Sequence, residues 1–243
     1  MKSKYQEYDF EKSRSRIDDI LSTEDKSFEE VDSIPSRDKL TFTNGFYINK
    51  TSALFVDIVD SSKLPSKYRR PILARIYRSF LSEAVAVING NDNCAEVNIN
   101  GDCVWGVFDA QYQYQINSVF DTAAKVSSII DTLNCMYKRK GIDPISVGIG
   151  LAYGRALMIK AGYSGSGLNE VVWMGDVVNE ASNLCSYGNQ SWNDKEMMVS
   201  SVFRNNLDDH NKGLLERNST RGCYHGNVIN KAMDDWLKEN SCE

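Results

Sequence analysis

Two aspartates stand where the surrounding sequence predicts buried backbone. Asp57 interrupts residues 52–59 (SALFVDIV), the most apolar run of the chain, and Asp102 follows the turn-forming pair Asn100-Gly101. A carboxylate inside a buried strand is costly unless it is paired with a cation or binds one. If the runs around Asp57 and Asp102 form neighbouring strands, both carboxylates meet at one sheet end. There they make a site for Mg²⁺ or Mn²⁺, which take carboxylate and phosphate oxygens.

The residues that follow Asp57 suit a phosphate. Residues 58–62 can present a run of backbone N–H groups, with the hydroxyls of Ser61 and Ser62, at the start of a helix. Each acid also has a structural interpretation, since Asp57 alone could pair with a lysine and Asp102 alone could be a turn residue. The two acids and the phosphate segment together favour a catalytic site.

The composition describes an ordinary globular domain. The chain has 243 residues, 28 Lys and Arg against 33 Asp and Glu, a net charge of −5 and 42% hydrophobic residues. This acidic balance, without a basic block, argues against nucleic acid and anionic membranes as partners. The sequence has neither a long apolar span nor the apolar core of a signal peptide, so we expect a cytoplasmic protein.

Cysteine and histidine usage narrows the chemistry further. No two of the six cysteines have CxxC spacing, which predicts reduced, mostly packed thiols rather than a disulfide framework or a zinc site. Both histidines lie in the polar last fifth of the chain, so a histidine-based triad is excluded. Any catalysis must therefore use carboxylates, hard metal ions and amides. The cysteines are Cys94, Cys103, Cys135, Cys185, Cys223 and Cys242.

Hydrophobic periodicity predicts the elements that position the acids. They are a strand at 52–59, a helix at 70–89, strands at 95–99 and 102–108, a helix at 116–137 and a strand at 145–154. The two strands around Asn100-Gly101 form a hairpin, because this pair is the strongest short turn signal. The order β-α-β-β-α-β predicts an α+β fold, a ferredoxin-like sheet with helices on one face and appended elements.

Further elements are expected on both sides of this core. They are a helix near 14–21, a hairpin around Asn44-Gly45, a strand at 155–162 that pairs with 145–154 about a turn, a strand at 169–175, a helix at 176–188, a strand running into a helix at 197–207 and a terminal helix at 227–237. We divide the chain into a charged N-terminal arm (1–47), a central domain (48–205) and a polar C-terminal tail (206–243).

Four segments carry a family resemblance. They are Leu54–Ser62 (LFVDIVDSS), Asn98–Asp102 (NINGD), the glycines Gly148, Gly150, Gly154 and Gly162, and Gly175–Ser182 (GDVVNEAS). In this order they resemble four parts of the class III nucleotidyl cyclases, the adenylyl and guanylyl cyclase catalytic domain. These parts are the first metal-binding strand with its phosphate loop, the turn with the second metal aspartate, the glycine-punctuated strand pair and the transition-state helix. The resemblance makes residues 48–205 the catalytic domain.

The resemblance implies a head-to-tail homodimer with active sites at the interface. One chain would bind two Mn²⁺ or Mg²⁺ ions through Asp57, Asp102 and the backbone of Ile58. Ser61 and Ser62 of that chain would hold the β- and γ-phosphates of a nucleoside triphosphate. The other chain would supply the base pocket and Asn179, which would act in catalysis together with the two aspartates. The ribose 3′-oxygen would attack the α-phosphorus, releasing pyrophosphate and closing a 3′,5′-cyclic nucleotide.

The base-reading positions depart from the purine cyclases. The position of the purine-reading Lys or Glu is Asn98, that of the second reader is Val172, and Phe55 would line the pocket beside them. A site that must pair a purine edge needs those donors and acceptors, so the pocket is not built for ATP or GTP. In this the chain is similar to the bacterial pyrimidine cyclases of Pycsar antiphage defence. UTP is favoured, giving cyclic UMP as a second messenger for a separate cyclic-nucleotide effector. CTP, or ATP with atypical readers, remains an alternative.

One departure concerns catalysis itself. The arginine that usually stabilises the pentavalent phosphate, four residues after Asn179, is Asn183 here. A regulatory dimer that has lost catalysis is therefore a third alternative, although retention of both metal acids argues against it. We expect Gly148, Gly150 and Gly154 to serve the fold, and Trp105 and Trp173 to be packing side chains.

Overall fold

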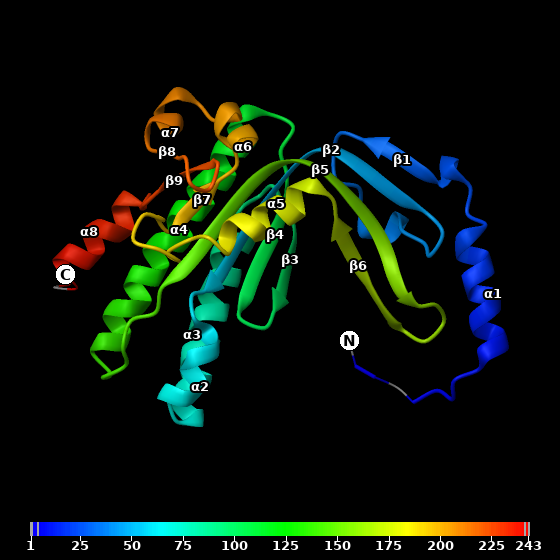
Figure 1. The fold of residues 1–243 in the computed structure, drawn as a ribbon, viewed down its shortest axis with the longest axis horizontal. Helices are drawn as coiled ribbons and strands as arrows, with labels where there is room; N and C mark the ends of the chain where they lie inside the picture. The colour runs from blue at the N-terminus through cyan, green and yellow to red at the C-terminus, as the bar shows by residue number, and fades with distance from the viewer. Residues whose placement is uncertain (1, 4, 241, 243) are drawn as a thin grey trace.

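The central sheet confirms the predicted topology. The computed structural model describes residues 2–3, 5–240 and 242. Its core elements are β2 (Gly45–Ile58), α3 (Arg70–Asn89), β3 (Cys94–Asn100), β4 (Cys103–Asp109), α4 (Gln113–Lys138) and β5 (Val147–Tyr163). Their strands belong to one nine-stranded sheet, in which β3-β4-β2-β5-β7-β9-β8 are neighbours in this order, β1 pairs with β2 and β6 pairs with β5 (Figure 1). The predicted ferredoxin-like α+β fold is therefore correct.

The alternation of side chains along β2 sorts them between two cores. Leu54 and Val56 pack with residues of α3 and α4, including Phe80 and Phe120. Phe55, between them, belongs to a second cluster on the opposite face of the sheet. Because side chains alternate with period two, Asp57 projects from the same face as Phe55, away from the two long helices.

Helix α5 (Asp176–Cys185) covers part of that second face by unusually close packing. A Cβ at Gly150 would lie 2.0 Å from the carbonyl oxygen of Ala181, and one at Gly148 would lie 2.1 Å from that of Cys185. Only glycine leaves room for the helix backbone at these two positions. These glycines therefore serve the fold, as predicted.

The turn predicted between 145–154 and 155–162 is absent, since both runs belong to the unbroken strand β5. Gly154 pairs with Thr51 of β2, and Ala156 pairs with Ile48 beyond a bulge, so the sheet holds the chain extended through the glycine. The reversal comes after Tyr163 instead, with Gly165 at φ 81° and Gly167 at φ 75°. It leads into β6 (Leu168–Met174), which pairs with the distal half of β5.

The N-terminal arm contains the predicted helix but not the predicted hairpin. Helix α1 spans Phe10–Leu21, and β1 (Phe28–Val31) pairs in parallel with the start of β2. Asn44 closes a turn before β2 through its side chain, which accepts from the Thr41 N–H at 2.7 Å and donates to the Lys39 carbonyl at 2.9 Å. An Asn-Gly pair here is thus a side-chain-capped turn and not a strand reversal. Short 3₁₀ turns at Asp25–Ser27 and Arg37–Lys39 flank β1.

The C-terminal part extends the sheet. The predicted strand and helix at 197–207 are β7 (Met197–Val199) and α6 (Ser201–Asn206), and the terminal helix is α8 (Lys231–Glu239). The polar region between them, predicted as a tail, adds α7 (Asp209–Gly213) and two strands, β8 (Glu216–Asn218) and β9 (Cys223–Gly226). The end residues 1 and 243 of the predicted arm and tail lie outside the described residues.

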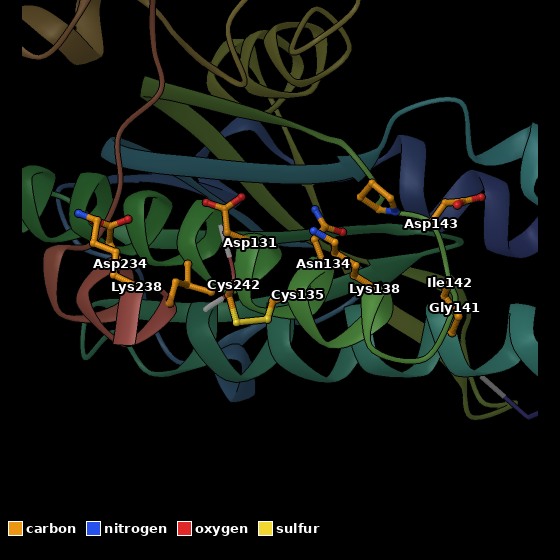
Figure 2. Close-up of a pocket in the computed structure, with 12 residues that line it drawn as sticks. Asp131, Asn134, Cys135, Lys138, Gly141, Ile142, Asp143, Asp234, Lys238 and Cys242 are labelled. Carbon is orange, nitrogen blue, oxygen red and sulfur yellow. A yellow bond between two sulfur atoms is a disulfide. The ribbon is translucent and has the colours of Figure 1, made fainter. Parts of the chain in front are cut away.

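A disulfide corrects the cysteine prediction. Cys135 of α4 is bonded to Cys242, 107 residues away, while Cys94, Cys103, Cys185 and Cys223 are free thiols. Figure 2 shows the bond beside a cavity of about 650 Å³ between α4, α8 and the segment from Gly141 to Pro144. The chain folds α8 back along α4, and that return could not be read from spacing. Over the residues that the structure describes, no helix has the length and apolar character that crossing a bilayer requires.

Candidate active site

The structure brings Asp57 and Asp102 together. Strand β2 pairs with β4 as far as Val56 opposite Val104, so Asp57 at the end of β2 lies next to the turn that carries Asp102. The pKa of Asp57 is raised to about 6, first by burial and then by the neighbouring Asp102 carboxylate. Two acids held this close without a cation repel each other, so the arrangement favours a bound positive charge.

A second observation supports a cation at this point. The Oδ2 atom of Asp102 is buried and has no hydrogen-bond partner. A buried carboxylate oxygen is normally satisfied, and a hard metal ion would satisfy this one. Among the described residues there is no group of three or more His, Cys, Asp or Glu able to hold a metal. The chain thus offers two carboxylates, and backbone, water or phosphate oxygens must complete the coordination.

The phosphate segment is a tight turn directly after these acids. Ile58 is the last residue of β2, and Ser61–Lys63 form a 3₁₀ turn before the short helix α2 (Leu64–Lys67). Asp60 adopts a left-handed conformation, φ 57° and ψ 28°, which reverses the chain sharply enough to keep both serines near the strand end. Ser61 is partly exposed and Ser62 is exposed, so both can reach a ligand.

Two of the predicted base-pocket residues, Phe55 and Asn98, lie along one face of neighbouring strands. Val172 on β6 faces the other side, because its neighbour Trp173 packs in the cluster that holds Phe55. Phe55 stands opposite Trp105, and Trp105 stands opposite Asn98, so the three side chains form a row across β2, β4 and β3. Phe55 stacks on Trp105 with ring centroids 5.0 Å apart and an interplanar angle of 2°. The Nδ2 group of Asn98 is buried without a hydrogen-bond partner.

Strand β6 reaches the same region from the other side. Val172 is partly buried, and the next residue, Trp173, donates from Nε1 to Glu96 Oε2 at 3.2 Å. Glu96 lies two residues before Asn98 on β3, so this bond ties the strand of one predicted reader to that of the other. Trp173 is 5% exposed, which confirms it as a packing residue.

Asn179 and Asn183 are both exposed on α5, one helical turn apart. The structure does not place either of them against Asp57 or Asp102 of the same chain. This separation is what an active site shared between two chains requires, and their roles stay predictions.

Sequence reasoning missed several groups around the acids. Burial, with Asp57 and Asp102, raises the pKa of Cys103 to about 12. Cys185 is buried and donates from Sγ to the Gly148 carbonyl at 3.1 Å. Burial also raises the pKa of Cys185, so both thiols stay protonated and the side chains at these two positions beside the acids are uncharged. A two-residue turn at Asn100-Gly101 would pair Asn98 with Cys103, but the observed turn is Gly101-Asp102, which places Asp102 in the turn and Trp105 opposite Asn98.

Comparison with known proteins identifies the family. No family model matches the chain. The uridylate cyclase of Treponema porcinum is 38% identical over 236 residues, covering 96% of this chain and 82% of that protein. The uridylate cyclase of Gulbenkiania mobilis is 36% identical over 259 residues, covering 99% of this chain and 100% of that protein. The chain belongs to the uridylate cyclase family.

Solved structures place this uridylate cyclase family member in the class III nucleotidyl cyclase fold. The adenylyl cyclase CyaB from P. aeruginosa superimposes with a TM-score of 0.61 at 17% identity, covering 71% of this chain and 85% of that one. The guanylyl cyclase Cya2 superimposes with a TM-score of 0.56 at 16% identity, covering 70% and 82%. Class III cyclases generally use divalent metal ions and act on nucleotides, in keeping with the acid pair of this uridylate cyclase family member.

Proposed function

We propose that this protein converts UTP to 3′,5′-cyclic UMP and pyrophosphate. The observation that carries the proposal is the buried acid pair, Asp57 with Asp102, at the strand end that leads into the phosphate segment. The choice of UTP rests on the two relatives named uridylate cyclase, which match nearly the whole chain.

The acid pair would hold two divalent ions, Mg²⁺ or Mn²⁺, with the backbone carbonyl of Ile58 as a further ligand. When bound, such ions lower the pKa of the ribose 3′-hydroxyl and neutralise charge on the pyrophosphate oxygens. The unpartnered Oδ2 of Asp102 and the raised pKa of Asp57 support this assignment, since a carboxylate oxygen without a hydrogen-bond partner and two adjoining carboxyl groups both suit a cation.

The phosphate segment would orient the triphosphate. The left-handed turn at Asp60 exposes the hydroxyls of Ser61 and Ser62 next to the metal acids. Hydroxyl and backbone N–H donors are the usual partners of phosphate oxygens, and they fix the position of the α-phosphorus.

The base would be recognised by uncharged side chains. The amide of Asn98 offers an unpartnered buried donor, and Val172 offers no hydrogen bond. A carbonyl oxygen of uracil can accept from the amide, whereas a purine needs a second polar reader that Val172 does not provide.

The active site would form between two copies of the chain in a homodimer. One copy would supply the acids and the phosphate turn, and the other would supply the base pocket, with Phe55 at its margin, and Asn179 to hold the reacting groups. The residue one turn beyond Asn179 is Asn183, which carries no charge to stabilise the transition state. We therefore expect a slow enzyme.

The product would serve as a cytoplasmic second messenger in antiphage defence, read by a separate effector. This placement rests on the resemblance to the Pycsar pyrimidine cyclases and on the full-length relatives.

The test is incubation of the pure protein with Mn²⁺ and each of the four ribonucleoside triphosphates, with the products separated and identified by mass. Cyclic UMP should dominate. Dominant cyclic CMP or cyclic AMP would contradict the substrate, and a complete lack of product would favour the regulatory dimer. Asp57→Asn and Asp102→Asn provide matched inactive controls, because they keep the size of each side chain.

A further inference from the structure

A groove with a basic rim lies between α3 and α4. Its volume is about 760 Å³, and buried side chains, among them Leu133 and Ile142, form an apolar floor. Among the described residues that line it, four are cations and one is an acid. The cations are Arg75, Arg78, Arg139 and Lys140, and the acid is Glu83. We call this surface the α3–α4 groove.

Most of these cations have no partner of opposite charge. Arg139 donates to the Asn240 carbonyl oxygen at 2.8 Å, and its place at the end of α4 suits a cation. Arg75, Arg78 and Lys140 form no ion pair with a carboxylate in the part of the chain that the structure describes. Arg75 and Arg78 lie in the first half of α3, so the dipole at its C-terminal end does not account for them. A chain of net charge −5 that gathers cations along an apolar groove presents a surface for an acidic partner with apolar side chains.

Helix α1 has the complementary chemistry. It has no buried residue, and Phe10, Ile17 and Leu21 are 62%, 53% and 78% exposed. Spacings of seven and four residues place these three side chains in one stripe along the helix. Asp18 and Asp19 follow Ile17, and both are exposed and form no ion pair within the described residues. The C-terminal half of α1 is thus apolar and acidic, where the α3–α4 groove is apolar and basic.

The two surfaces lie on opposite sides of one chain. Figure 1 shows α1 at the right end of the molecule, and α3 and α4 toward the left. The next element after α1 is β1, which is paired with β2 on the same side as α1 (Figure 1). The contact of α1 with its own chain is loose: Arg16 lies over the ring of Tyr163 at 4.5 Å, and a cavity of about 260 Å³ remains between the helix and Gly162. A partner for the groove must therefore come from another molecule.

We propose that the α3–α4 groove binds helix α1 of a second copy of this chain, with the apolar stripe on the groove floor and Asp18 and Asp19 at the basic rim. Such a contact joins two different surfaces of the chain, which is the heterologous arrangement that builds rings or chains of copies. No residue of either surface belongs to the proposed active site. The contact is therefore made in addition to the proposed catalytic interface, and it links catalytic dimers into larger assemblies.

The experiment measures the mass of the full chain by gel filtration with light scattering, over a range of protein concentrations at low ionic strength. Assemblies of more than two chains should form and should dissociate at high salt, because salt screens exposed charges. Arg75→Glu with Arg78→Glu should raise the dissociation constant of these assemblies by on the order of tenfold or more. Lys125→Glu with Lys231→Glu is the matched control, because it makes the same change in net charge at two exposed lysines outside the groove and should leave association nearly unchanged.

An exchange of charges tests the pairing itself. Asp18→Lys with Asp19→Lys should weaken association as much as the arginine reversal does, and the combination of both reversals should restore it. Assemblies that persist in either reversal would mean that a different surface joins the copies, and an unaltered protein that forms none would mean that the groove takes some other partner. Either result overturns the proposal.

Two further points keep the test decisive. If circular dichroism shows that the arginine reversal unfolds the protein, Arg75→Gln with Arg78→Gln replaces it, and the same loss of association is required. Mass does not depend on turnover, so a protein that fails to cyclise UTP would overturn the proposed function and still test this contact.

Discussion

The two faces of the sheet differ in how they are covered. On one face α3 and α4 pack against Leu54 and Val56 and close a core that excludes water. On the other, α5 reaches the backbone at Gly148 and Gly150, and the row from Phe55 to Asn98 stays partly open.

The difference shows where the two acids meet. Asp57 and Asp102 lie on the open face, where the Oδ2 atom of Asp102 has no hydrogen-bond partner, and an apolar pair there would be more stable. The closed face supports the fold, and we propose that the open face carries the chemistry.

The largest expected effect comes from the acid pair. Asp57→Asn or Asp102→Asn should reduce cyclisation by on the order of 10³-fold or more, because the metal ions lose a ligand. Removing the mutual repulsion should at the same time raise the melting temperature measured without metal. If mass analysis of the product shows that either variant is still active, the proposed contrast between the two faces is wrong.

A smaller effect should follow from disturbing how α5 sits on the open face. Gly150→Ala places a Cβ against backbone 2.0 Å away, whereas Gly154→Ala meets only Val177 at 3.7 Å. Gly150→Ala should cost about 1–3 kcal/mol of unfolding free energy and about 100-fold in activity, through displacement of Asn179. Gly154→Ala is the control and should be close to unaltered in both denaturation and turnover. Equal behaviour of the two would mean that α5 does not position the site.

The closed face should respond through stability alone. The pKa of Glu196, at the start of β7, is raised from 4.5 to about 7, first by burial and then by Asp131 of α4. Between pH 4.5 and about 7, the carboxyl group of Glu196 therefore stays protonated in the folded protein, whereas it is ionised in the unfolded chain. The free energy of unfolding should fall as the pH rises from about 4.5 to 7, by up to on the order of 3 kcal/mol.

Glu196→Gln cannot ionise and should reduce this dependence in urea denaturation at pH 4.5, 6 and 8, leaving the part that the raised pKa of Asp57 contributes. The variant should match the unaltered protein at low pH and exceed it at pH 8, with the preference for UTP over ATP unchanged. If Glu196→Gln changes the substrate preference, the closed face does not act through stability alone and the contrast between the two faces is wrong.

Local signals predicted the parts of the fold that local physics decides. The periodicity of α3 and α4 and the Asn100-Gly101 turn were sufficient for the core topology and for bringing Asp57 and Asp102 together. The errors arose where residues that are distant in the sequence determine the local conformation. Gly154 stays extended because β2 holds it, and Cys135 bonds Cys242 because α8 returns along α4.

The candidate site was predicted in outline but not in detail. The acids, Asn98 and the phosphate turn carry their own signals, since each breaks an otherwise apolar or regular pattern. Trp105 carries no such signal, and its position between Phe55 and Asn98 follows only from the observed register of the hairpin.

Strand β5 has one more consequence. It runs without a break from Gly148, beside Asp57, to Ile159, beside Val172. The end of the sheet that holds the acids and the strand that carries Val172 are thus joined by one continuous strand, whose pairing with β2 shifts register only between Ile48 and Thr51.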